Sequence, residues 1–152
     1  MYRIAEMKDI DEITELRILQ QKENYKNDYK VEDKIFSQNT KKFLNDNLNK
    51  NIYFFIKELD NKIAAMCGIQ LINYLPMYNE GIGLRGYICS VYTREEYRKQ
   101  GIQTHLLKNA IQFSKDKNIG IIELKTTNPD AVSVYEKVGF KEVKKRMRLE
   151  LV

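Results

Sequence analysis

The chain has 152 residues, 43% hydrophobic and 31% charged, which is the length of one ordinary domain with a core of its own. This composition excludes a disordered protein, and the sequence holds no run of about 18 apolar residues that could cross a bilayer. A net charge of +5 favours an anionic partner without choosing among nucleic acid, a phosphorylated molecule and acidic lipid.

The chain contains no internal repeat, low-complexity stretch or linker, so we expect residues 1–152 to form a single domain. The first residues lack the continuous apolar stretch of a signal peptide. Cys67 and Cys89 lie in apolar segments, and no Cys/His spacing matches a metal site. We therefore expect a protein of the reducing cytoplasm that uses no metal.

The first third of the chain shows one strand pattern followed by two helical ones. Residues 2–4 indicate a short strand. Asp9 followed by Glu12 resembles the capped start of a helix, and apolar residues at helical spacing continue that helix to about Tyr25. A second helical pattern covers residues 31–48.

The middle of the chain is typical of antiparallel strands. Residues 52–56 and 63–72 predict two strands joined by a tight turn at 60–61. Residues 74–83 break the pattern with a proline and glycines, and we expect a loop. The β-branched and aromatic residues of 87–93 predict a third strand in this part of the chain.

The last third returns to alternating helices and strands. Helical spacing begins at Gly101, and residues 119–125 predict a strand. Asn128 followed by proline is a strong helix start, and Gly139 ends that helix. Residues 140–151 alternate enough for a closing strand or hairpin. The order β-α-α-β-β-β-α-β-α-β predicts an α/β fold (an α+β sandwich), with a mixed, mostly antiparallel central sheet flanked by helices.

Two segments could bind phosphate. Gly81-Ile-Gly83-Leu-Arg-Gly86 matches the dinucleotide motif G-x-G-x-x-G, but a loop precedes it and a strand follows it, so we interpret it as a flexible loop. Residues 98–104 follow a strand and open a helix, where free N–H groups and the helix dipole attract anions. The alternative is a plain loop with two solvated cations.

Three segments taken together resemble the GNAT family of N-acetyltransferases. Arg98-Lys-Gln-Gly101-Ile-Gln103 is similar to the family's R/Q-x-x-G-x-G/A motif at a helix start. The strand before it corresponds to Ser90-Val-Tyr-Thr93. Downstream, Asn128-Pro-Asp-Ala131 and Tyr135-Glu-Lys-Val-Gly139-Phe140 look like the family's N-x-x-A and Y-x-x-x-G-F segments.

The resemblance implies an acetyl-CoA site and a role for each residue in it. Backbone groups of Val91 and Thr93 would hold the pantetheine arm, with the Val91 N–H polarising the thioester carbonyl. Asn128 would contact the cofactor near its pantetheine, and Tyr135 would donate a proton to the departing thiolate. Tyr135 could instead serve only in core packing. The remaining residues around the pyrophosphate would be Arg98, Lys99, Gln100, Gly101, Ile102, Gln103 and Thr104.

Two positions depart from the family pattern. Gln103 stands where the family has Gly or Ala, so its side chain must find room beside the ligand or turn away. A family glutamate is missing near the start of the strand, which leaves Glu80, Tyr87 and Ser90 (through water) as candidates for the general base. His105 falls opposite the apolar helix face, and we expect it at the surface.

The predicted activity is transfer of acetyl from acetyl-CoA directly to a primary amine of a small molecule or a peptide. We expect the acceptor between residues 9–49 and the loop 74–86. One alternative is a non-catalytic CoA-binding sensor of the same fold. Another is a nucleic-acid binder using basic residues of 141–148, but no recognition motif supports it, so we expect neither nucleic acid nor membrane as a partner. Homodimers are common in the family, and the resemblance extends that expectation here.

Overall fold

A five-stranded sheet forms the centre of the protein. The computed structural model describes residues 1–26, 28–78, 83–143 and 146–151. The sheet has the order β1-β2-β3-β4-β5, antiparallel from β1 to β4 and parallel between β4 and β5. The predicted mixed, mostly antiparallel sheet is therefore confirmed. The elements are β1 (Tyr2–Ile4), α1 (Ile10–Tyr25), α2 (Asp33–Asn47), β2 (Ile52–Leu59), β3 (Lys62–Asn73), β4 (Leu84–Thr93), α3 (Ile102–Asp116), β5 (Ile122–Leu124) and α4 (Pro129–Lys137).

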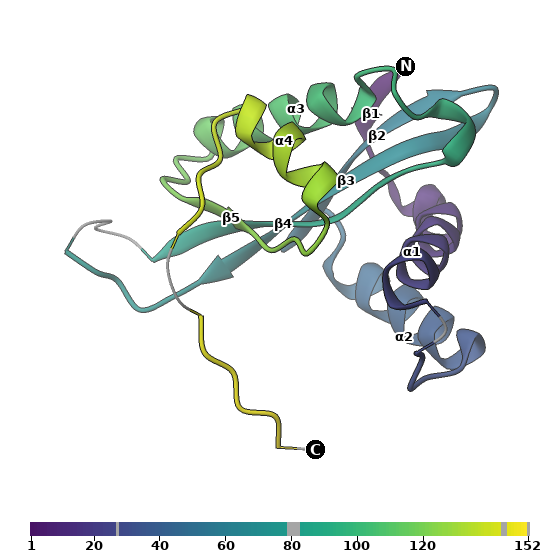
Figure 1. Cartoon of the computed structure of the whole chain (residues 1–152), viewed down its shortest axis with the longest axis horizontal. Helices are drawn as coiled ribbons and strands as arrows, with labels where there is room; N and C mark the ends of the chain where they lie inside the picture. The colour runs from purple at the N-terminus through teal and green to yellow at the C-terminus, as the bar shows by residue number, and fades with distance from the viewer. Residues whose placement is uncertain (27, 79–82, 144–145, 152) are drawn as a thin grey trace.

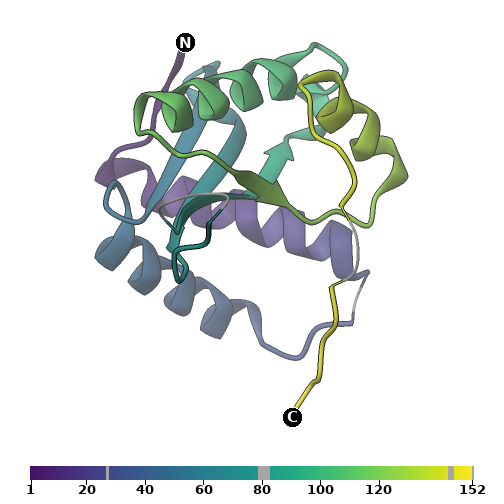
Figure 2. The same ribbon diagram turned by 90° about the vertical axis from the view of Figure 1, so that its left-hand side faces the viewer.

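Helices α1 and α2 cover one face of the sheet, and α3 and α4 cover the other (Figures 1 and 2). Because side chains of a strand point alternately to its two faces, the neighbours Phe54 and Phe55 of β2 enter different core clusters. Phe54 packs with Leu16 of α1, and Phe55 packs with Leu106 of α3. Burying one such side chain contributes about 1.5–3 kcal/mol to the free energy of unfolding. Packing on the two faces of the sheet therefore holds the helices against the strands.

The turn between β2 and β3 is determined locally. Asp60 and Asn61 both have positive φ angles, 51° and 58°. Two consecutive residues of this conformation form the tight turn whose twist matches that of paired strands, and Asp and Asn tolerate it better than most residues. The predicted hairpin is confirmed.

The first and last helices begin where the sequence indicates, but only one cap is as predicted. The Asn128 side chain accepts a hydrogen bond from the Asp130 N–H at 3.0 Å and caps α4. Asp9 precedes α1 without capping it. Its carboxylate instead accepts from the Glu6 N–H at 2.7 Å and pairs with Arg3 at 2.7 Å. The charge of Arg3 therefore redirects this carboxylate away from the helix.

The predicted closing strand at residues 140–151 is wrong for the described part of that segment, which forms no strand. Its apolar residues are largely exposed, including Val143, Met147 and Leu149 at 83%, 94% and 82%. In Figure 1 residues 146–151 lie away from the sheet, near the C-terminus. Alternation predicts a strand only where one face is buried, and after Phe140 the described residues of this segment bury neither face.

Candidate functional site

A bulge interrupts β4 at Ser90. Gly68 of β3 is paired with Cys89, but Met66 is paired with Tyr92, so two residues of β4 stand opposite Cys67 alone. Ser90 takes up the extra length with a left-handed conformation, φ 50°. Such bulges bend a strand and end regular pairing, and they are frequent beside active sites.

Strands β4 and β5 separate at the same point. Their pairing covers only Gly86–Ile88 of β4 and Ile122–Leu124 of β5. Beyond it, the segment Cys89–Thr93 has no strand partner on its β5 side among the residues that the structure describes. The sheet therefore presents a short free backbone edge in its interior, between β4 and the segment that leads to α4.

The backbone groups of Val91 and Thr93 face this free edge. The Arg94 N–H donates to the Ala64 carbonyl in β3 at 2.9 Å, so alternation directs Val91 and Thr93 the other way. Their carbonyls already accept side-chain hydrogen bonds, from Gln20 Nε2 at 3.1 Å and from Arg98 Nε at 2.9 Å. Because these carbonyls are occupied, the N–H groups of Val91 and Thr93 are the ones that this edge offers to a ligand.

The N-terminus of α3 lies at the end of the same strand and carries unpaired donors. Gly101 precedes the helix with φ 72°, and Lys99 also has a left-handed conformation at φ 62°. The first hydrogen bond of the helix runs from the His105 N–H to the Gly101 carbonyl at 3.2 Å. The N–H groups of the preceding turn lack intrahelical acceptors, and no acidic residue occupies that turn. Since a Cβ added at Gly101 would meet no atom within 4 Å, the turn is open to an anion.

The Arg98 side chain is not directed at this anion site. Its Nη2 contacts both carboxylate oxygens of Glu23 on α1, at 2.8 and 3.0 Å, and the guanidinium lies 5.5 Å from the Tyr92 ring. The hydrogen bond to Glu23 raises the pKa of Arg98. Arg98 therefore ties α1 to β4, and the exposed side chains of Lys99 and Gln100 are the ones that line the open turn.

The Gln103 side chain turns away from the open helix end and toward the bulge. Its Nε2 lies 3.1 Å from the Met66 carbonyl, 2.8 Å from the Tyr92 carbonyl and 2.9 Å from Thr93 Oγ1. Its Oε1 is buried without a partner among the described residues. The amide thus contacts carbonyls at the point where the sheet is irregular, and the side chain, although longer than the Gly or Ala of the family pattern, points away from the open end of the helix.

This role predicts that Gln103→Ala is destabilising. The change removes the side-chain donor that contacts the Met66 and Tyr92 carbonyls and Thr93 Oγ1, which costs about 0.5–1.5 kcal/mol of the free energy of unfolding for each hydrogen bond lost. Urea denaturation of the variant checks this value, with Gln112→Ala on the exposed side of the same helix as the control, expected within about 0.5 kcal/mol of the wild type. An equally small effect of Gln103→Ala would contradict the role.

Tyr135 of α4 completes this part of the molecule. It packs against the same cluster as Val91 and Ile102, and its ring meets Phe140 edge to face at 6.0 Å. Burial raises the pKa of Tyr135 to about 12, and the nearby Cys67 thiol adds to the rise. Its hydroxyl makes no hydrogen bond to the part of the chain that the structure describes. It is therefore a protonated donor with no acceptor among the described residues.

The candidates for a base are less well placed. Glu80 lies outside the described residues. Tyr87 shares its face of β4 with Cys89, the face toward α1 and α2. The Ser90 hydroxyl accepts a hydrogen bond from Arg17, which occupies one of its lone pairs. His105 is exposed and stacks on the Tyr2 ring at 3.8 Å, which confirms the predicted surface position.

The sequence interpretation named Glu23 only as one of several acids that could suit a cationic acceptor, and it missed that three polar residues of α1 contact β4. Arg17 contacts Ser90, Gln20 contacts Val91, and Glu23 contacts Arg98 and accepts from the Tyr92 hydroxyl at 3.1 Å. Their spacing of three residues places them on one side of the helix. That regular polar spacing beside the apolar stripe is the signal that could have identified them.

The glycines of the motif at 81–86 have structural rather than ligand-binding explanations where the structure describes them. A Cβ at Gly83 would lie 1.8 Å from the Tyr74 carbonyl oxygen, and one at Gly86 would lie 2.7 Å from Ile69 Cδ1. Gly86 is inside β4, not at a helix start. Gly81 lies outside the described residues. The interpretation against a dinucleotide site therefore agrees with the geometry.

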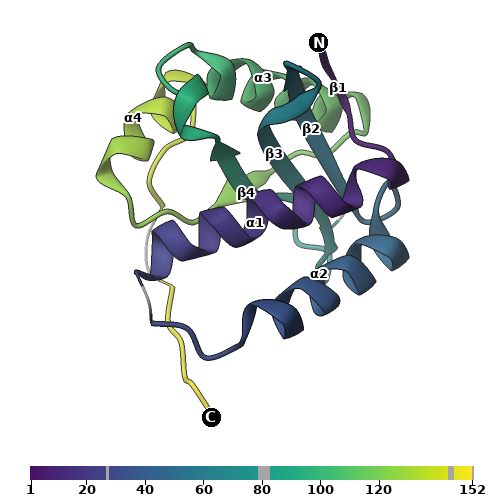
Figure 3. The same cartoon turned by 90° about the vertical axis from the view of Figure 1, so that its right-hand side faces the viewer.

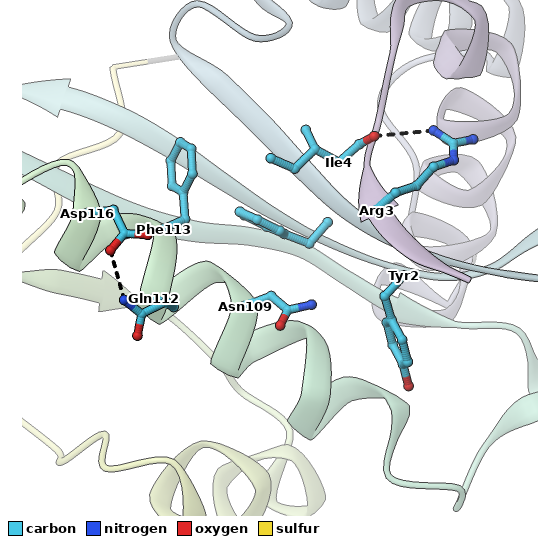
Figure 4. Close-up of a pocket in the computed structure, with 8 residues that line it drawn as sticks. Tyr2, Arg3, Ile4, Asn109, Gln112, Phe113 and Asp116 are labelled. Carbon is cyan, nitrogen blue, oxygen red and sulfur yellow. Dashed lines mark hydrogen bonds between the residues drawn. The ribbon is translucent and has the colours of Figure 1, made fainter.

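A separate hollow of about 320 Å³ lies between β1 and α3, lined in part by Arg3, Asn109 and Asp116 (Figure 4). None of the predicted site residues lines it. Within the described ranges, no three His, Cys, Asp or Glu side chains are grouped as a metal site would require. No helix in those ranges combines the length and apolar character needed to span a bilayer.

Comparison with known proteins gives consistent results. The model of the acetyltransferase (GNAT) family matches residues 11–140. An N-alpha-acetyltransferase of Saccharolobus solfataricus is 31% identical, over 93% of this chain and 80% of its own length. One of Sulfurisphaera tokodaii is 28% identical, over 94% and 82%. The crystal structure of a predicted acetyltransferase from Clostridium acetobutylicum with acetyl-CoA superimposes with a TM-score of 0.85 at 30% identity, covering 99% of this chain and 96% of that one.

Proposed function

Since this chain belongs to the acetyltransferase (GNAT) family, we propose that it transfers the acetyl group of acetyl-CoA directly to the N-terminal amine of a peptide. The names of the archaeal relatives support an α-amino acceptor, and the Clostridium acetobutylicum structure supports acetyl-CoA as the donor. We further propose that residues 1–152 form one acetyltransferase domain, because both core clusters pack on the same sheet.

One observation carries the proposal: the free N–H edge of β4 adjoins the open first turn of α3. An extended amide arm can add to such an edge as a strand does, with Val91 and Thr93 as its partners. At the other end of the arm, the N–H groups from Lys99 to Thr104 suit a pyrophosphate. Asn128 keeps its side-chain N–H group available, since its Oδ1 is the atom used in capping α4. The residues present therefore fit acetyl-CoA.

Each part of the site then has a chemical role. Acetyl-CoA supplies a thioester that an amine can attack. The Val91 N–H donates to the carbonyl oxygen as negative charge develops there, which lowers the barrier because the donor is already in place. Tyr135 donates its hydroxyl proton toward the leaving sulfur. With a pKa of about 12, this phenol is protonated throughout the pH range of an assay.

An α-amine also reduces the demand for a general base. Its pKa of about 8 means that deprotonation costs about 1.4 kcal/mol at pH 7, whereas a lysine amine at about 10.4 costs about 4.6 kcal/mol. Neither Tyr87 nor Ser90 is a strong base. A site without a well-placed carboxylate among its described residues therefore suits an α-amine better than a lysine side chain.

The test uses two peptides of one sequence, each with a single free amine. One has a free N-terminus and a blocked lysine, and the other has the reverse. We expect mass spectrometry after incubation with acetyl-CoA to show acetylation of the first peptide only. Modification of the lysine peptide alone, or of only small amines such as spermidine, would overturn the α-amino assignment. Calorimetric binding of acetyl-CoA without turnover of any amine would favour the sensor alternative.

A further inference from the structure

Arg17 differs from the other arginines that pack around the sheet. Arg3, Arg94 and Arg98 each pair with a carboxylate: Asp9 at 2.7 Å, Glu15 at 3.2 Å and Glu23 at 2.8 Å respectively. Arg17 reaches no carboxylate in the described part of the chain. It is a half-buried cation on α1 without a counter-ion from the protein residues described.

The guanidinium of Arg17 is nevertheless held in place. It donates to the Ser90 hydroxyl and lies 5.6 Å from the centre of the Phe36 ring of α2. Burial lowers the pKa of Arg17, although a guanidinium still keeps its proton. Reduced hydration strengthens its attraction for an anion compared with an arginine in open solvent. The position is therefore prepared for a negative group that the described chain does not supply.

This position adjoins the proposed reaction centre. Ser90 immediately precedes Val91, whose N–H we propose as the donor to the thioester carbonyl. Arg17 of α1 contacts Ser90, and Phe36 of α2 lies against the Arg17 guanidinium. Helices α1 and α2 cover this face of the sheet (Figure 3). An amine that attacks the carbonyl at Val91 from this face places its own neighbouring atoms next to the guanidinium.

We infer that Arg17 binds a carboxylate of the acceptor, and this inference rests on the proposed function. The enzyme should therefore prefer peptides that begin with aspartate or glutamate. In these two residues the side-chain carboxylate is only a few bonds from the α-amine, which matches the closeness of Ser90 to Val91. The planar guanidinium can bind both carboxylate oxygens at once. The Phe36 ring then packs beside the methylene groups of the acceptor residue.

The first experiment compares peptides that differ only at their first residue. We expect kcat/KM for a glutamate peptide to exceed that for the glutamine peptide by at least about 10-fold, as for a hydrogen bond to a charged group. In Arg17→Met this ratio should fall to about one. Lys108→Met removes a positive charge from the exposed side of α3, and its ratio should equal that of the wild type. An unchanged ratio in Arg17→Met would overturn the inference, as would free glutamate reacting faster than the glutamate peptide.

A binding measurement separates this inference from the proposed function. Calorimetry in the presence of CoA compares two product peptides, acetyl-Glu and acetyl-Gln, on the wild type and on Arg17→Met. Tighter binding of acetyl-Glu by the wild type alone supports the role of Arg17 even if no turnover is seen, in which case only the proposed function fails. Equal binding of the two peptides by the wild type would overturn the role of Arg17. Loss of an unpaired cation should not lower the melting temperature of the variant, which checks that it is folded.

Discussion

Replacing Tyr135 by phenylalanine is expected to lower kcat for acetyl transfer by about 100-fold, the contribution typical of a positioned proton donor. Phenylalanine keeps the ring that packs against Phe140 and removes only the hydroxyl. The leaving thiolate must then depart without a donor from α4. Single-turnover rates at saturating acetyl-CoA measure the effect on the chemical step. The affinity for acetyl-CoA, followed by calorimetry, should change by less than about 2-fold, since the hydroxyl is needed in the transition state.

Tyr53→Phe is the matched control for this prediction. Tyr53 is also half-buried on the α3 face of the sheet, and its ring packs on Phe113 at 4.6 Å, but its hydroxyl points to the Lys50 carbonyl at 3.4 Å. Its loss should leave the rate within about 2-fold of the wild type. If Tyr135→Phe gives an equally small change in kcat, Tyr135 is a packing residue and another group protonates the thiolate.

Replacing Thr104 by aspartate should weaken binding of acetyl-CoA by about 15-fold while leaving the fold intact. Thr104 is the third residue of α3, inside the turn whose N–H groups we propose for the pyrophosphate. A carboxylate about 5 Å from a doubly charged group in water costs about 1.7 kcal/mol. The same carboxylate is favourable for the helix itself, because it opposes the positive end of the helix dipole. The melting temperature should therefore not fall, and the binding defect should shrink as salt is raised.

Asn109→Asp tests whether this effect is local. It introduces the same charge on the same helix, but farther along, at the hollow between β1 and α3 (Figure 4). Its affinity for acetyl-CoA should stay within about 2-fold of the wild type. Equal losses of affinity in the two variants would indicate an effect of net charge, and no loss in Thr104→Asp would place the pyrophosphate elsewhere.

The sequence by itself determined the elements whose signals are local. The turn at Asp60 and Asn61 and the Asn128 cap of α4 depend on residues within a few positions of each other, and both are as predicted. The order of elements from β1 to α4 and the helix that opens after Gly101 were likewise readable. Local backbone preferences and the period of apolar residues carry this information in the chain itself.

Tertiary structure decided where the polar side chains of the site point. The sequence could not indicate that Gln103 turns to Met66, that Arg98 pairs with Glu23, or that Arg17 reaches Ser90, because these partners are 37, 75 and 73 positions apart. The closing strand failed for the same reason, since alternation predicts a strand without showing that a partner and a buried face exist. A long polar side chain has several rotamers of similar energy, and the packed surroundings choose among them by which acceptors they leave unsatisfied.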